Sequence, residues 1–462
     1  MPITERIIFK NERAQRSSYV WQNCILRTCL HRSTCLPYDL GCMMKAFRIA
    51  NVHLIDPEKK IGEVGSITVK DGLIAADDAN VPTIDGHGKY LAPGIIDIGT
   101  KVCEPGERHK ESFRSAGIAA AAGGVTTLVT RPDTKPAVDS PETLEFASRR
   151  ALAACIVNTY QMAALTKGRL GREMTEISFL QDAGAVAFTD CDAVVSDTKV
   201  LSRAFTYAGQ LGAIVIGHPQ DPGLSKGASA TSGKFASLRA IPAVSPMAER
   251  LGIERDLAMV EMTNVKYHAD QISTALSLPA LEQAKQKGLD VTAGVSIHHL
   301  TLNEFDVADY RSFFKVKPPL RSEVDRQAMV SALASGLIDI ISSMHTPQDE
   351  ESKRLPYEKA ASGAVALETL LPAVLRLYHA KQLTLPQIFS ALSLNPAKRF
   401  GLPGGTLKKG APADLVLFDP NVPFILDRFK LNSKSKNTPF DGQKMQGVVL
   451  ATFVAGKKVY ER

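Results

Sequence analysis

Acidic, cysteine and histidine side chains stand just after several short apolar runs of this sequence. The candidates are Asp190, Cys191, Asp192, His218, His298 and His345. Such side chains bind zinc, and a zinc ion with an open coordination position lowers the pKa of a bound water to about 7. The residue types alone therefore point to metal-assisted hydrolysis.

The spacing of the histidines does not support a metal site. Two histidines usually reach one zinc as HxH on a strand or HxxxH on a helix, and neither pattern occurs in this sequence. His298 and His299 are adjacent, so on a regular strand they would point to opposite faces. A lone histidine at a strand end is more often a hydrogen-bonded structural residue, and an acidic run after a strand can cap its own loop.

Eight short apolar runs alternate with helical segments and would position these side chains. The runs are residues 94–98, 125–129, 154–158, 185–189, 213–217, 265–269, 291–295 and 338–342. Helices are expected at 110–122, 141–152, 197–210, 276–287 and 323–335. The alternation predicts an α/β fold, a (β/α)8 TIM barrel with its functional groups at the carboxyl ends of the strands. An open doubly wound sheet is the alternative, but its glycine-rich phosphate turn is absent after the first strand.

The segments flanking the barrel have the pattern of short strands and turns. We expect residues 44–92 and 401–462 to pair as a small composite β domain beside a barrel at 93–400. The glycine- and serine-rich segment 219–234 is either a mobile flap over the barrel mouth or disordered. The charged run 346–356 is expected to be a solvated loop.

The composition is that of a globular protein. Of 462 residues, 44% are hydrophobic and 22% are charged, and the net charge of +7 is spread without a long basic run. We therefore expect no binding to nucleic acid or to a membrane surface. No apolar run reaches the roughly 18 to 20 residues that cross a bilayer, so a cytoplasmic location is expected.

The first 43 residues differ from the rest of the chain. They contain Cys24, Cys29, Cys35, Cys42 and the single tryptophan, Trp21. Three interpretations stay open: an organelle transit peptide, a zinc or disulfide module, and upstream sequence translated from a misassigned start. We favour the misassigned start, and otherwise expect an unstructured extension, because the cysteine spacing fits no CxxC pattern and no apolar signal region is present.

A series of longer motifs keeps its order and spacing along the chain. The motifs are LAPGIIDI (91–98), EPGERHKE (104–111), AAAAGGVTT (119–127), PDTKPAVDSP (132–141), GAVAFTD (184–190), ISTA (272–275), HHL (298–300), KVKPPLR (315–321) and SKSKNTPF (433–440). Over residues 45–460 the sequence closely resembles the class I dihydroorotases of the amidohydrolase superfamily. The resemblance implies a (β/α)8 barrel with a composite β domain, in which zinc-bound hydroxide reversibly cyclises carbamoyl aspartate to dihydroorotate in pyrimidine synthesis.

The chain departs from this family on the first barrel strand. There the family carries DxHxHxR, in which the histidines bind metal and the arginine binds the substrate carboxylate. Gly99, Lys101 and Cys103 occupy these three places.

Other functional positions of the family are altered as well. Gln271 stands in place of the sixth-strand histidine, and Met344 in place of the aspartate that is metal ligand and general acid/base, although a thioether cannot transfer a proton. Asp133 and Lys317 replace asparagines that contact substrate, and a carboxylate at 133 is expected to repel a dianion. The resemblance retains His218 as the fifth-strand ligand and Asp190 or Cys191 as the bridging acid.

Three hypotheses follow. The first is a pseudoenzyme without metal or other cofactor, an oligomeric scaffold that binds the aspartate carbamoyltransferase catalytic subunit, as the non-catalytic homologues it resembles do. Its vestigial pocket would comprise Cys103, Asp133, Cys191, Asp192, His298, Lys317 and His345. The second is a zinc-dependent cyclic amide hydrolase rebuilt around His218, His298 and His345 with Asp190 or Asp192. The third is a metabolite sensor in which Lys101 and Lys317 bind an acidic ligand.

Overall fold

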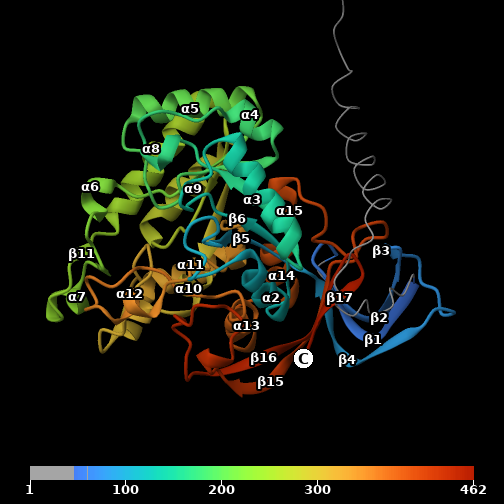
Figure 1. Ribbon diagram of the computed structural model, residues 1–462. Helices are drawn as coiled ribbons and strands as arrows, with labels where there is room; N and C mark the ends of the chain where they lie inside the picture. The colour runs from blue at the N-terminus through green and yellow to red at the C-terminus, as the bar shows by residue number, and fades with distance from the viewer. Residues whose placement is uncertain (1–45, 60) are drawn as a thin grey trace, which may run out of the picture. The chain divides into compact units, whose positions relative to one another are not determined.

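Eight parallel strands form the centre of the described chain, as the alternation of apolar runs predicted (Figure 1). The computed structural model describes residues 46–59 and 61–462, so the prediction for residues 1–43 lies outside the described residues. The strands are β5 (Ile95–Thr100), β6 (Val125–Thr130), β7 (Asn158–Ala163), β8 (Ala185–Phe188), β9 (Ile214–Gly217), β12 (Lys266–Ala269), β13 (Val291–Ser296) and β14 (Ile340–Ser342). Each strand pairs in parallel with the next, which confirms the predicted TIM barrel.

The first and last barrel strands adjoin. The backbone N–H of Lys101, just after β5, donates to the carbonyl oxygen of His345, just after β14, at 2.9 Å. The carboxylate of Asp97 on β5 accepts from the backbone N–H of Ser343 at 2.7 Å. The residues that follow β5 and β14 therefore share one side of the barrel mouth.

Helices lie around the outside of these strands (Figure 1). They include α2 (Phe113–Ala122), α3 (Pro141–Ala154), α4 (Ile177–Asp182), α5 (Thr198–Gln210), α8 (Met247–Thr263), α9 (Leu278–Gln286), α11 (Glu323–Ser335), α13 (Leu370–His379), α14 (Leu385–Phe389) and α15 (Asn395–Phe400). The helix predicted at 323–335 has these bounds because Ser322 caps its first turn and Gly336, at φ 81°, ends it. Every helix of the described residues is too short or too polar to cross a bilayer.

A second sheet joins the two ends of the described chain. Its strands are β1 (Ala46–Asp56), β2 (Ile61–Lys70), β3 (Leu73–Ala75), β4 (Thr83–Pro93), β15 (Leu415–Ile425), β16 (Lys444–Val454) and β17 (Lys457–Glu461), in the order β17-β16-β15-β4-β1-β2-β3. Since β4 pairs with both β1 and β15, the N- and C-terminal segments form one composite sheet, as predicted. The hydroxyl of Thr452 on β16 donates to the carbonyl of Ala121 on α2 at 2.7 Å, which ties this sheet to the barrel.

The structure differs from the sequence-based expectations at three places. The third barrel strand begins at Asn158 rather than at residue 154, because α3 continues to Ala154. The segment 219–234, for which no helix or strand was expected, contains α6 (Pro222–Ser225) and β10 (Ala230–Thr231), which pairs with β11 (Ala243–Val244). The run 346–356 is not wholly solvated, because α12 (Glu350–Arg354) buries Lys353, whose Nζ donates to three backbone carbonyls.

Candidate functional site

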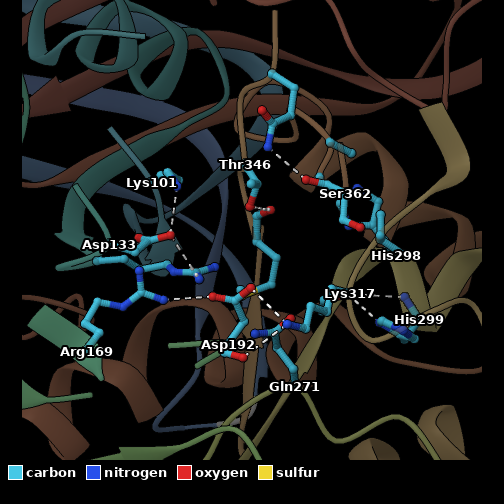
Figure 2. Close-up of a pocket in the computed structure, with 17 residues that line it drawn as sticks. Lys101, Asp133, Arg169, Asp192, Gln271, His298, His299, Lys317, Thr346 and Ser362 are labelled. Carbon is cyan, nitrogen blue, oxygen red and sulfur yellow. Dashed lines mark hydrogen bonds and ion pairs between the residues drawn. The ribbon is translucent and has the colours of Figure 1, made fainter. Parts of the chain in front are cut away.

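A cavity of about 270 Å³ opens at the carboxyl ends of the barrel strands (Figure 2). Its lining includes the predicted site residues Lys101, Asp133, Asp192, Gln271, His298, Lys317 and Met344. Arg131, Arg169 and His299 line it as well. The remaining predicted site residues, Gly99, Cys103, Asp190, Cys191, His218 and His345, lie outside this lining.

Lys101, Arg131 and Asp133 form one charged cluster at the cavity wall. Lys101 Nζ lies 3.0 Å from Asp133 Oδ2, and Arg131 Nη2 lies 3.4 Å from the same oxygen. Burial opposes the charge of Asp133, but Arg131 and Lys101 outweigh it and lower the pKa of this carboxyl. The repulsion of an anion predicted for Asp133 is therefore offset by two cations.

Arg169, Asp192 and Lys317 form a second cluster on the same cavity. Arg169 Nη2 lies 2.9 Å from Asp192 Oδ1, and Lys317 Nζ lies 3.1 Å from Asp192 Oδ2. Burial again opposes ionisation, but Lys317 and the neighbouring arginines lower the pKa of Asp192 below its ordinary value. In both clusters a carboxylate bridges two basic side chains, as Figure 2 shows.

His298 and His299 occupy a helix rather than a strand. Both belong to α10 (Ile297–Thr301), so the argument that two adjacent side chains of a regular strand point to opposite faces does not apply to them. His299 is held on both sides, because its Nδ1 lies 2.8 Å from Ser296 Oγ and its Nε2 3.3 Å from the carbonyl oxygen of Pro319. His298 Nε2 is buried without a partner, and burial lowers the pKa of His298 to about 3 and that of His299 to about 4.

Gly99 on β5 and Met344, just after β14, share one small space. A Cβ atom on Gly99 would stand 2.6 Å from Met344 Sδ and 3.0 Å from its backbone nitrogen. No side chain at position 99 fits while Met344 keeps this place. Met344 and Gln271 both have a positive φ, of 48° and 59°, so each stands on a tight turn just after its strand.

His218, Asp190 and Cys191 line a smaller cavity of about 30 Å³. Asp190 serves its own loop, because one carboxylate oxygen accepts at 3.0 Å from the backbone N–H groups of Leu165 and Thr166, and the other accepts from the Thr166 hydroxyl. Both ring nitrogens of His218 are buried without a hydrogen-bond partner, and burial lowers its pKa to about 3. Burial likewise raises the pKa of the Cys191 thiol to about 12, which makes it a poor nucleophile or metal ligand at neutral pH.

His345 and Cys103 are buried side chains that contact the protein rather than the main cavity. His345 Nδ1 accepts from the backbone N–H groups of Ala366, at 3.1 Å, and Leu367, at 3.4 Å, while Nε2 lies 3.5 Å from Glu111 Oε2. Cys103 is buried, and the burial raises its pKa to about 12. Neither side chain is available to a ligand in the main cavity.

The donor set does not fit the zinc centre that the resemblance implies. A hydrolytic zinc needs about three protein ligands and an open position. Among residues 46–59 and 61–462, no three His, Cys, Asp or Glu side chains are grouped so that they could hold a metal ion. His218 has free nitrogens, but Asp190 is committed to Thr166, and positions 99, 271 and 344 carry Gly99, Gln271 and Met344.

Arg169 was not singled out from the sequence. It lies on a 3-10 turn (Lys167–Arg169) in the loop after β7, and placing this strand five residues or so too early removed the loop from consideration. A strand ending at Ala163 puts residues 164–171 at the barrel mouth, where a basic side chain would be a candidate.

The sequence matches two family models. One, described as dihydro-orotase-like, matches residues 88–277, and one described as the amidohydrolase family matches residues 234–459. The dihydroorotase of Wolbachia sp. subsp. Drosophila simulans is 39% identical over 428 residues, which cover 90% of this chain and 97% of that protein. The dihydroorotase of Ehrlichia canis is 37% identical over 421 residues, covering 89% of this chain and 94% of that protein.

Solved structures share the fold. The L-hydantoinase (dihydropyrimidinase) from Arthrobacter aurescens has a TM-score of 0.82 at 26% identity, over 90% of this chain and 96% of that chain. The dihydropyrimidinase from Brevibacillus agri NCHU1002 has a TM-score of 0.78 over 90% of this chain and 95% of that chain, but at 21% identity it supports the fold alone.

Proposed function

Because the chain belongs to the dihydroorotase-like family of amidohydrolases, we propose that it is a non-catalytic member that scaffolds aspartate carbamoyltransferase in pyrimidine biosynthesis. The proposal that the protein is non-catalytic rests on the side chains that line the barrel mouth. Where the family resemblance places metal ligands, this cavity has Lys101, Gln271 and Met344, and two ion-pair clusters occupy its wall.

The remaining side chains supply no substitute for that chemistry. A general acid/base must exchange a proton near neutral pH, and the Met344 thioether has none to exchange. His298 and His299 are buried with pKa values lowered to about 3 and about 4, so neither gains a proton readily at neutral pH. Asp133 and Asp192 are each held ionised between two cations, which makes them weak bases.

A turnover and metal assay of one preparation tests this proposal. The full chain is purified without chelator, its zinc content is measured, and ring closure of carbamoyl aspartate and opening of dihydroorotate are followed. The Wolbachia relative, carried through the same purification, is the positive control. We expect no stoichiometric zinc and no turnover above buffer, whereas turnover that a chelator abolishes would overturn the non-catalytic proposal.

The partner is proposed from the resemblance to non-catalytic homologues. The proposal is supported by the fold, since the barrel and the composite sheet are intact while the positions of the family's metal ligands are changed. Co-expression with the aspartate carbamoyltransferase catalytic subunit of the same organism, followed by size-exclusion chromatography, tests it. We expect one co-eluting complex, and two separate peaks at micromolar concentration would remove the scaffold role.

A cyclic amide hydrolase with a rebuilt site around one metal is the second candidate. The names of the relatives and the two unpartnered nitrogens of His218 favour it. In that case the purified protein would hold about one zinc. That zinc would be lost in His218→Ala and kept in His268→Ala, a matched buried histidine on β12.

A further inference from the structure

The wall of the main cavity carries more positive than negative charge. Its basic side chains are Lys101, Arg131, Arg169 and Lys317, and its acidic ones are Asp133 and Asp192. Four positive and two negative charges leave +2, and the two lining histidines are neutral at pH 7. Two carboxylates lie behind the wall. Asp190 accepts from its own loop. Asp270 accepts from Gln271 through one oxygen and interacts electrostatically with Arg131, so it offsets part of the positive charge from behind.

The basic side chains retain donors that the protein does not use. Lys101 Nζ has three N–H groups, and Asp133 is its one ion-pair partner among the described residues. The guanidinium of Arg131 has five N–H groups, and among the described residues its side-chain partners are Asp133, at 3.4 Å, and the Cys191 thiol. Arg131 is 9% exposed, so these donors have little access to water from anywhere but the cavity.

Buried polar atoms at the wall lack partners too. His298 is 1% exposed and its Nε2 has no partner. Asp133 is 6% exposed and its Oδ1 has none either. A buried polar atom without a partner is costly, so it marks a place where a ligand or water completes the hydrogen bonding. The cavity wall thus combines the neutral His298 imidazole with the charged Arg131 guanidinium.

From these contacts we infer that the cavity binds a small organic dianion, through its oxyanion groups, with Arg131, Arg169, Lys101 and Lys317 as the binding residues. A volume of about 270 Å³ suits a metabolite-sized ligand, and two negative charges balance the wall. Guanidinium groups bind carboxylate and phosphate oxygens through paired N–H donors, so dicarboxylates and phosphomonoesters share the required chemistry. The inference rests on the proposed function, because a cavity without a metal leaves these cations free to contact the ligand.

Titration calorimetry on the full chain in EDTA tests this inference. The probes are succinate, glycerol 3-phosphate and inorganic phosphate, with acetate as the monoanion. We expect at least one dianion to bind at least tenfold more tightly than acetate, with an affinity that falls as salt is raised. Succinate and glycerol 3-phosphate distinguish a carboxylate ligand from a phosphate ligand. If no dianion gives measurable heat at millimolar concentration, the inference fails.

Two variants with opposite expected effects separate binding from folding. Lys317→Met, at a half-exposed position, removes a ligand contact and is expected to weaken binding at least tenfold. Asp192→Asn removes the negative charge that competes with the ligand for Arg169 and Lys317, so it is expected to tighten binding severalfold. Loss of fold cannot tighten binding. Lys458→Met, which breaks an exposed ion pair with Glu461 on β17, is the control and should leave the affinity unchanged.

The outcomes distinguish this inference from the proposed function. Dianion binding together with turnover of carbamoyl aspartate would keep the site and overturn the non-catalytic proposal. If the protein shows no turnover, no zinc and no dianion binding, the non-catalytic proposal stands and the inference of a dianion site fails. The inference of a dianion site would also fail if the parent chain, Lys317→Met and Asp192→Asn all bound the dianion with equal affinity.

Discussion

The packing of Met344 against Gly99 couples two altered positions of the barrel mouth. Each residue stands at a position where the family resemblance places a metal ligand. The two lie at the adjoining ends of β5 and β14, with the Met344 sulfur in the space that a side chain at 99 would need. Met344 is 6% exposed, so its side chain fills part of the barrel interior. The loss of one ligand position is thus coupled sterically to the loss of the other.

The first prediction concerns this pair. Gly99→Ala is expected to lower the free energy of unfolding by about 1–3 kcal/mol, because its Cβ overlaps the Met344 sulfur in a packed interior. Urea denaturation measures the change. In the Met344→Ala background the sulfur is absent, so adding Gly99→Ala should cost at least about 1 kcal/mol less than in the parent chain. Additive effects of the two substitutions would contradict the steric coupling.

At the scale of elements, one buried carboxylate docks the C-terminal segment on the barrel. Glu111, just before α2, is fully buried and accepts from the hydroxyl groups of Ser115 and Ser433. Ser435 adds a bond to the carbonyl of Lys110 at 2.8 Å, and His345 Nε2 lies 3.5 Å from the Glu111 carboxylate. The motif 433–440 is therefore explained by structure, since its serines fasten the chain beside the barrel mouth.

The second prediction tests this docking. Glu111→Ala leaves the buried hydroxyls of Ser115 and Ser433 without their acceptor and is expected to cost about 2–6 kcal/mol, about 1–3 for each hydroxyl. Hydrogen exchange at the amides of 433–437 should be faster than in the parent chain. Exchange in β1 and β2, at the far side of the composite sheet, should change little. Glu111→Gln keeps one acceptor oxygen, so its stability and exchange rates should lie between those of the parent chain and of Glu111→Ala. Unchanged exchange at 433–437 would contradict a docking role.

Much of this architecture was predictable from sequence, and the site was predictable only in part. Alternating apolar runs specify parallel strands and their order, because buried strands need apolar side chains on both faces. The third strand was misplaced because residues 154–158 are apolar enough for a strand, while tertiary packing continues α3 to Ala154. Ion pairs between different loops, such as Arg169 with Asp192, join residues 23 positions apart, and no local pattern reports such a contact.

The third prediction rebuilds the missing ligands on adjoining elements. Position 99 is on β5 and position 101 follows the strand directly, so side chains two residues apart are expected to point to one face, next to position 344 after β14. A Gly99→His, Lys101→His, Met344→Asp variant therefore offers three zinc ligands, and we expect it to retain about one zinc after dialysis. Metal analysis measures this. Gly99→His with Met344 kept should bind none and be less stable, and equal zinc in both variants would contradict the steric account.

At the scale of the whole molecule, the barrel is built around neutral imidazoles. His218, His268, His298 and His299 are all buried, and burial is the largest cause of their lowered pKa values, about 3 for the first three and about 4 for His299. An unfolded chain protonates its histidines near pH 6.5. Acid therefore favours the unfolded chain well before the ion-paired carboxylates Asp133 and Asp192 respond, because their pKa values are lowered in the fold.

The fourth prediction is the pH dependence that follows from these histidines. Between pH 6.5 and about 4 the unfolded state binds protons that the folded state excludes, so the free energy of unfolding is expected to fall steadily as pH is lowered. Urea midpoints across this range measure it. Each buried histidine contributes a slope of about 1.4 kcal/mol per pH unit below its unfolded pKa, so His268→Gln should reduce the slope by about that amount. His87→Gln, at an exposed imidazole on β4, is the matched control. A midpoint that stays constant down to pH 4.5, or an equal reduction in both variants, would mean that these imidazoles gain protons inside the fold.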